Sequence, residues 1–178
     1  MTIRLGARVL FGLWACLWGI ESQAEVDCFL GRWTLNVAAS ETREAPPRSM
    51  VIEMRSENGG IRYRSESLTA VDRRQIVEYV ARYDGVPSLV TGESGLLMPV
   101  MLKRIDARTV QASYLRGLAV AAVALRQVSM DGRRMTVTTK LMGQDGLVLS
   151  TLVFDRAEIR GSEDSECRLS NTAALKDL

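Results

Sequence analysis

The 178-residue chain contains no histidine, and this absence excludes several kinds of chemistry. Ser-His-Asp and Cys-His catalysis, histidine-ligated zinc or haem, and a histidine pH switch all need an imidazole. Lysine is also scarce, with three of the 23 basic residues, and the formal net charge is only +2. Because phosphate binding needs a clustered excess of cations, we expect no nucleic-acid partner. No metal-ligand spacing or cofactor motif occurs, so we expect no metal, no cofactor and no catalytic site.

The first 24 residues have the features of a secretory signal peptide. Two arginines precede the apolar run 9–20, which is shorter than the roughly 20 residues that span a bilayer. Ser22-Gln23-Ala24 is a small-x-small cleavage site, which predicts a mature chain that begins at Glu25 and is periplasmic or secreted. The alternative is an uncleaved anchor.

Cysteine is rare, with three in the whole chain. Cys16 lies within the apolar run, and a lipoprotein attached through it is the less favoured alternative, because Trp14 stands where a small residue is usual. Cys28 and Cys167 remain in the mature chain, and an oxidising compartment predicts a disulfide between them, the alternative being two free thiols. Since a disulfide requires Cα atoms within about 7 Å, the first and last elements would then be neighbours.

Most of the chain alternates apolar and polar residues with a period of two, which predicts β-strands. Turn signals such as Asn58-Gly59 and Asp131-Gly132 separate the runs, and 86–97 is expected to be a long loop. Residues 119–125 also fit a short helix, and the inward phase of 98–105 stays open. The expected strands are 32–37, 50–55, 61–66, 77–83, 98–105, 110–114, 120–128, 134–141 and 147–155.

An antiparallel meander of eight to nine strands must protect its two edges. Closure into a barrel does so and places the first and last strands side by side; a two-sheet sandwich is the alternative. An outer-membrane barrel does not fit, because charged residues occupy the polar face of nearly every strand and aromatics are too few for two girdles. The sequence therefore predicts an all-β barrel over 25–156, with no membrane insertion after signal cleavage, and a polar tail over 157–178.

The first strand carries the sequence Gly31-Arg32-Trp33-Thr34-Leu35-Asn36-Val37-Ala38-Ala39-Ser40. It resembles the G-x-W-x-L-N-x-A-x-S opening of small secreted bacterial lipocalin-like proteins. Further pieces match in order at 78–85, 90–92, 102–106, 128–132 and 135–140, so that the resemblance covers residues 29–156. It implies an exported lipocalin-like β-barrel from a largely uncharacterised family, without an established catalytic site. The paired cysteines, the acidic tail and the apolar segment 118–125 depart from the pattern.

The resemblance implies that Trp33 closes one end of the barrel, and Asn36 and Ser40 are expected to brace the following turn. Two sets of polar side chains are candidates for ligand binding. The tyrosines fall on apolar faces of different strands and either line a cavity or only pack in the core. The arginines lie close to inward positions, where each would grip a carboxylate or phosphate; alternatively they face outward or pair with Asp106 or Glu78. The two sets are Tyr63, Tyr79, Tyr83 and Tyr114, and Arg104, Arg116 and Arg126.

Three functions follow from these observations. The leading hypothesis is a non-catalytic exported barrel that binds a small apolar or amphipathic ligand. The second is an envelope protein-binding or inhibitory module with a filled core, which uses a loop or the apolar segment 118–125 as its binding surface; its protein partner is unknown. The third is an enzyme that depends on Asp, Glu, Tyr, Lys or Arg. A cavity would favour the ligand-binding barrel, and an exposed apolar patch would favour the protein-binding module. A carboxylate that converges with other polar groups in a pocket would favour the enzyme.

Overall fold

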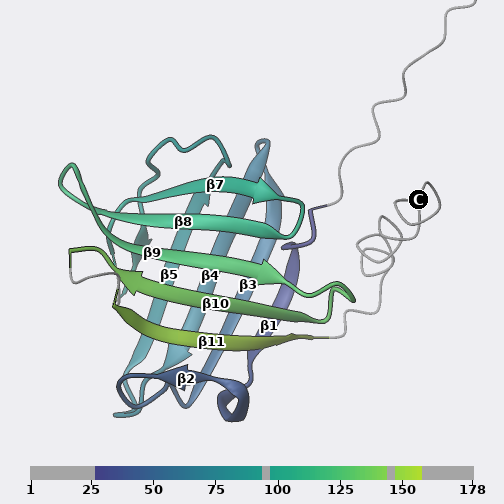
Figure 1. The fold of residues 1–178 in the computed structure, drawn as a ribbon, viewed down its shortest axis with the longest axis vertical. Coiled ribbons are helices and arrows are strands. Elements are labelled where there is room, and N and C mark those ends of the chain that lie inside the picture. Colours follow the sequence, from purple (N-terminus) through teal and green to yellow (C-terminus); the bar gives the residue numbers. More distant parts are fainter. Residues whose placement is uncertain (1–26, 94–96, 144–146, 158–178) are drawn as a thin grey trace, which may run out of the picture.

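The computed structural model describes residues 27–93, 97–143 and 147–157, and over this part of the chain the protein is all-β (Figure 1). The predictions made for residues 1–24, Cys16, Cys167 and the tail beyond residue 157 lie outside the described residues. The elements are β1 (Gly31–Leu35), η1 (Val37–Ala39, a 3-10 turn), β2 (Glu41–Thr42), β3 (Ser49–Glu57), β4 (Gly60–Leu68), β5 (Arg74–Ala81), β6 (Thr91–Gly92), β7 (Val100–Asp106), β8 (Thr109–Arg116), β9 (Ala119–Val128), β10 (Arg134–Leu141) and β11 (Val148–Arg156). Within the described ranges, no helix has the length and apolarity needed to span a membrane.

The strands form one antiparallel sheet that curls on itself, in the order β6-β5-β4-β3-β1-β11-β10-β9-β8-β7, while β2 pairs with β11 off this path. In Figure 1, β7–β11 lie in front of β3–β5 and cross them. Between the two ends of the path, Asp84 bridges to Lys103 and Ser88 to Val100, so the segment after β5 links the sheet back to β7. The first and last strands, β1 and β11, are neighbours, as the sequence predicted. A single curled sheet rules out the two-sheet sandwich.

All nine predicted strands are present, and 119–128 is a strand, not a helix. The prediction of eight to nine strands is nevertheless too low, because two strands of two residues each, β2 and β6, join the sheet. β6 lies inside the expected loop 86–97. There Gly92 adopts a φ of 157°, and a Cβ at this position would collide with the Ile76 carbonyl oxygen, so glycine lets β6 approach β5.

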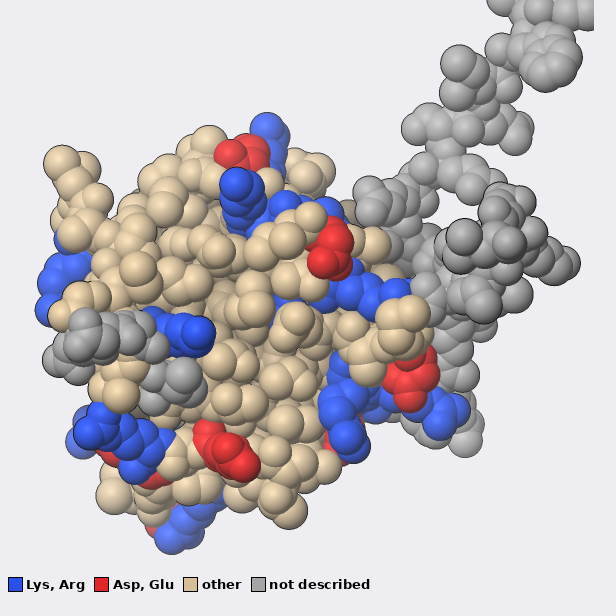
Figure 2. Space-filling view, viewed as in Figure 1, with Lys and Arg blue, Asp and Glu red and all other residues tan. Residues whose placement is uncertain are grey.

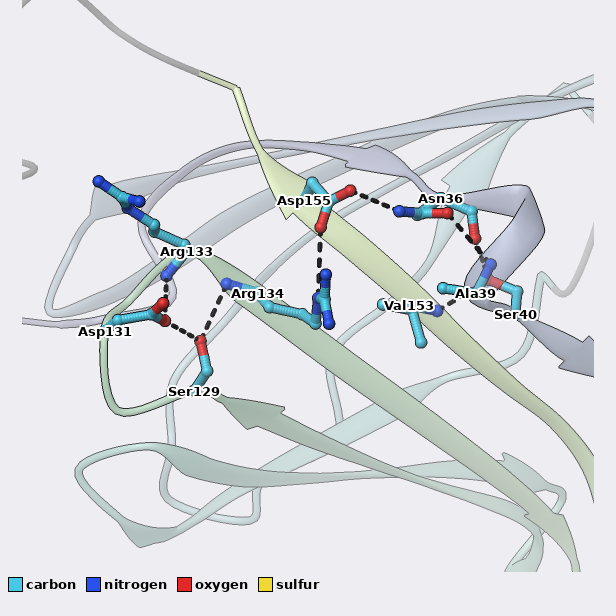
Figure 3. A network of polar contacts seen from close by, with 9 residues as sticks. All are labelled: Asn36, Ala39, Ser40, Ser129, Asp131, Arg133, Arg134, Val153 and Asp155. Carbon is cyan, nitrogen blue, oxygen red and sulfur yellow. Dashed lines mark hydrogen bonds and ion pairs between the residues drawn. The ribbon is translucent and has the colours of Figure 1, made fainter.

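The first strand ends earlier than predicted, at Leu35, because Val37 belongs to η1 instead of continuing the alternation. Asn36 caps this turn: its Oδ1 accepts a hydrogen bond from the Ala39 backbone N–H at 3.1 Å, and its Nδ2 donates to Asp155 at 2.7 Å (Figure 3). The Ser40 hydroxyl accepts from the Val153 backbone N–H at 2.9 Å. The expectation that Asn36 and Ser40 brace the turn is therefore confirmed, and both residues also tie it to β11.

The barrel interior is tightly packed at the end where β1 begins and β11 finishes, which we call the packed end. Trp33 is fully buried there, its indole N–H donates to the Phe29 carbonyl at 2.9 Å, and the Arg156 guanidinium lies 4.1 Å above its ring. The other buried inward-facing side chains here are Phe29, Met54, Ile61, Ala81, Val128, Met135 and Phe154. Trp33 thus lies in the place expected of a residue that closes the barrel.

Arg156 covers the packed end by binding backbone oxygens. Its guanidinium donates to the carbonyls of Cys28, Leu30 and Gly132 at 2.6–2.7 Å. These contacts join the segment before β1 to the turn between β9 and β10. One side chain therefore holds together three parts of the chain that are far apart in sequence.

Candidate functional site

The half of the interior away from the packed end is reached by solvent. Six inward-facing side chains there are only partly buried, each from a different strand: Met50, Ser67, Val77, Tyr114, Val137 and Leu152. Val100, Ala122 and Ala124 in the same half are buried. Val137 and Leu152 lie near the middle of β10 and β11, so their exposure is not an effect of the barrel rim. A filled core buries such positions, so their partial exposure indicates that solvent enters this half of the interior, which we call the accessible half.

Arg126 lies at the boundary between the accessible half and the packed end. The even-numbered residues of β9 face inward, and Arg126 is 3% exposed. One guanidinium nitrogen donates to the Tyr79 hydroxyl at 2.7 Å, and the guanidinium carbon lies 4.8 Å from the centre of the Tyr63 ring. Tyr63 and Tyr79 are directly opposite each other on β4 and β5 and stack with ring centres 4.6 Å apart. The barrel thus buries a cation against the face of one tyrosine ring, Tyr63, and the hydroxyl of another, Tyr79.

The tyrosines around Arg126 do not supply a negative charge. Burial raises the pKa of Tyr63, and it raises the pKa of Tyr79 well above the ordinary value, although the Arg126 charge opposes both shifts. Both hydroxyls therefore stay neutral at physiological pH. Arginine itself keeps its proton at any such pH. Within the part of the chain that the structure describes, the charge of Arg126 is thus stabilised by the dipole of the Tyr79 hydroxyl and the face of the Tyr63 ring.

Stability should fall in alkaline solution because of these tyrosines. Their pKa values in the folded protein lie above the unfolded value of about 10, so the folded state holds protons that the unfolded state releases. Their contribution is complete below pH 10 and is lost as the pH rises toward the folded pKa values. We expect tyrosinate absorbance from Tyr63 and Tyr79 to rise together with unfolding. Ionisation of these residues near pH 10 in a protein that stays folded would contradict this assignment.

A second interior arginine, Arg104, carries its own counter-ion. Val100 and Leu102 are buried on the inward face of β7 and Arg104, in the same row, is partly buried, which settles the open phase of 98–105. Arg104 forms an ion pair of 2.9 Å with Asp27 and lies 4.1 Å from the centre of the Tyr83 ring. The Tyr83 hydroxyl donates to the same carboxylate at 2.7 Å, and burial, followed by the Asp27 charge, strongly raises its pKa. Arg104 is therefore paired with a carboxylate, as one alternative expected, but the partner is Asp27 and not Asp106 or Glu78.

The candidate residues thus form two groups. Tyr63, Tyr79 and Arg126 meet near the middle of the barrel, whereas Tyr83 and Arg104 meet at Asp27. Tyr114 pairs in register with Ala122 on β9 and contributes to the accessible half. Arg116 is exposed at the end of β8 and joins neither group. Cys28 is buried beside Phe29, but Cys167 lies outside the described residues, so their disulfide stays a prediction.

Two residues that organise the interior were not singled out from the sequence. Asp27 precedes the first strand and therefore belongs to no alternating pattern, and Arg156 is the last residue of the last strand. The one available signal for Asp27 was its position beside Cys28, at the start of the folded region.

No group of three or more His, Cys, Asp or Glu within residues 27–93, 97–143 and 147–157 is placed to hold a metal ion.

The outer surface has two different faces. The outward side of β1 and β3–β5 carries ion pairs, including Arg32–Glu53, Arg64–Glu78 and Arg74–Glu66. All of these residues except Glu78 line a shallow groove. The opposite face, over β7–β11, is uncharged at its centre and has charged side chains mainly around its periphery (Figure 2). The outward residues Ala121, Val123 and Leu125 of β9 are exposed in part. The apolar segment 118–125 therefore contributes to both the interior and this uncharged face.

Comparison with known proteins finds a similarity in structure only. No protein-family model matches the chain, and no curated protein matches it. Among solved structures, the crystal structure of zebrafish ileal bile acid-binding protein complexed with cholic acid is similar over 73% of this chain and 99% of that chain. The TM-score is 0.45 and the sequence identity 11%. The similarity is weak and concerns the course of the chain in a curled all-β sheet.

Proposed function

We propose that this protein is an exported, non-catalytic β-barrel that binds a small amphipathic molecule in its accessible half. The observation that carries the proposal is the contrast between the two ends of the interior. Inward-facing side chains are buried at the packed end, whereas Val137 and Leu152, in the middle of their strands, are partly exposed. A cavity with apolar walls and a few polar groups is the usual form of a small-molecule site.

Three features of the sequence support export. Residues 1–24 have a signal-peptide pattern, Ser22-Gln23-Ala24 is a cleavage site, and the first strand resembles that of secreted bacterial lipocalin-like proteins. We accordingly propose a periplasmic or secreted protein, stabilised by a disulfide between Cys28 and Cys167. The second hypothesis, a protein-binding module with a filled core, is less favoured because the accessible half contains solvent-reached side chains.

The proposal is tested by titration with the neutral fluorescent probe N-phenyl-1-naphthylamine. We expect saturable binding with a rise in fluorescence, and we expect Val137→Phe, which fills the accessible half, to weaken it about 10-fold, or about 1.4 kcal/mol. Val123→Phe is the matched control, because this substitution adds the same side-chain volume on the outward face of β9. This control should bind the probe within about twofold of the unchanged protein.

Circular dichroism establishes that both variants fold. Two outcomes would refute interior binding: no saturable binding by the unchanged protein, or an equal loss of binding in the folded Val137→Phe and Val123→Phe variants. The second outcome would place the probe on the uncharged outer face and favour the protein-binding hypothesis.

A further inference from the structure

Among the described residues, the interior of the barrel holds one more positive charge than negative. Three charged residues lie there: Asp27, Arg104 and Arg126. Asp27 is already bound by Arg104 at 2.9 Å and by the Tyr83 hydroxyl at 2.7 Å. No carboxylate of residues 27–93, 97–143 or 147–157 forms an ion pair with Arg126. A buried charge without a counter-ion is costly, which makes the position of Arg126 a candidate site for an anion.

The guanidinium of Arg126 also has unused hydrogen-bonding capacity. Its second terminal nitrogen is buried and has no hydrogen-bond partner, while the first donates to Tyr79. Arginine presents its donors in a planar fork that matches a carboxylate in two-point binding. The unpartnered donors are therefore those that a bound anion would use.

The neighbours of Arg126 lead from this cation into the accessible half. Val137 is directly opposite Arg126 on β10, and Leu152 follows in the same row on β11. Both side chains are partly exposed, as are Met50 and Val77 across the barrel. A molecule that fills this space would thus meet apolar walls along its body and a single cation at its inner end.

We propose, resting on the function proposed above, that the ligand is an amphipathic monoanion whose acidic group binds Arg126 and whose apolar body extends into the accessible half. A single unbalanced cation matches one negative charge, and the apolar walls disfavour small hydrophilic anions such as inorganic phosphate. The acidic group lies deep in the barrel, and the apolar body points away from the packed end. Arg126 is a ligand-binding residue, and Tyr79 positions it.

The test compares three twelve-carbon probes by calorimetry below their micelle concentrations: dodecanoate, dodecan-1-ol and dodecyltrimethylammonium. We expect the unchanged protein to bind dodecanoate about 10- to 100-fold more tightly than the alcohol, the range of a charge-assisted hydrogen bond, and the cation most weakly. Arg126→Met should remove the preference for dodecanoate and leave affinity for the alcohol within about threefold. Lys140→Met is the matched control, because it removes one cation from an exposed, outward position of β10.

A second variant, Tyr79→Phe, keeps the charge and removes the hydroxyl that holds Arg126. It should reduce the preference for dodecanoate by part of the effect of Arg126→Met, again without changing binding of the alcohol. The inference is overturned if dodecanoate and dodecan-1-ol bind equally, or if Arg126→Met and Lys140→Met weaken dodecanoate alike; in both cases the proposed function survives. Absence of binding by all three probes would overturn the proposed function itself.

Discussion

Replacement of Trp33 by alanine should destabilise the protein by about 3–5 kcal/mol, the usual cost of removing a fully buried tryptophan. Trp33 is completely buried, and its ring lies beneath the Arg156 guanidinium at 4.1 Å. Its loss leaves a cavity at the packed end and deprives the Phe29 carbonyl of its indole donor. Because small domains are stable by only about 5–15 kcal/mol, this single change removes a large share of the total.

Urea unfolding followed by circular dichroism measures this effect, with Trp33→Phe as an intermediate variant. Phenylalanine keeps an aromatic ring beneath Arg156 but cannot donate to Phe29, so it should cost less than alanine. A loss below about 1 kcal/mol for Trp33→Ala, within the range of a surface substitution, would show that the tryptophan does not close the barrel.

The double variant Arg126→Met with Tyr79→Phe should stabilise the ligand-free protein by about 1–4 kcal/mol, the range seen when buried ionic groups are replaced by apolar residues of similar volume. Arg126 is 3% exposed and has no carboxylate partner among the described residues. The single variant Arg126→Met should gain less, because the buried Tyr79 hydroxyl then loses its partner at a cost of about 1–3 kcal/mol.

Denaturant unfolding of the delipidated protein measures this gain, and Lys140→Met is again the control with the same change of charge. Stabilisation together with loss of dodecanoate binding would indicate that Arg126 is retained for its ligand at the expense of stability. Destabilisation by more than about 1 kcal/mol would instead show that its contact with the Tyr63 ring is a structural support.

Most strands and their inward faces could be predicted because alternation reports burial directly, whereas the blurred alternation of 98–105 left its inward face open. Tyr63 and Tyr79, for example, share a face with apolar residues two positions away. β2 and β6 could not be predicted, since two residues carry no period and their pairing with β11 and β5 depends on the rest of the fold. The early end of β1 was missed because the Asn36 cap overrides the alternation through Val37.

Sequence reasoning singled out Arg104 and Arg126 but could not predict how they are arranged, and their role in ligand binding stays a prediction. The sequence made Arg104 and Arg126 equal candidates for ligand binding, and only the structure shows that their surroundings differ. Arg104 finds Asp27, from a segment outside any strand, whereas Arg126 finds neutral tyrosines. Which carboxylate reaches which cation is decided by the curling of the sheet across long sequence separations, and no local pattern records it.

The most direct test of interior binding is methyl NMR of the protein, labelled at valine and leucine, during titration with dodecanoate. We predict that the resonances of Val77, Val137 and Leu152 shift with one common saturation curve, while those of the outward residues Val123 and Leu125 do not move. Shifts confined to Val123 and Leu125, or no saturable shift at any of the five, would contradict the account of the accessible half as a binding site.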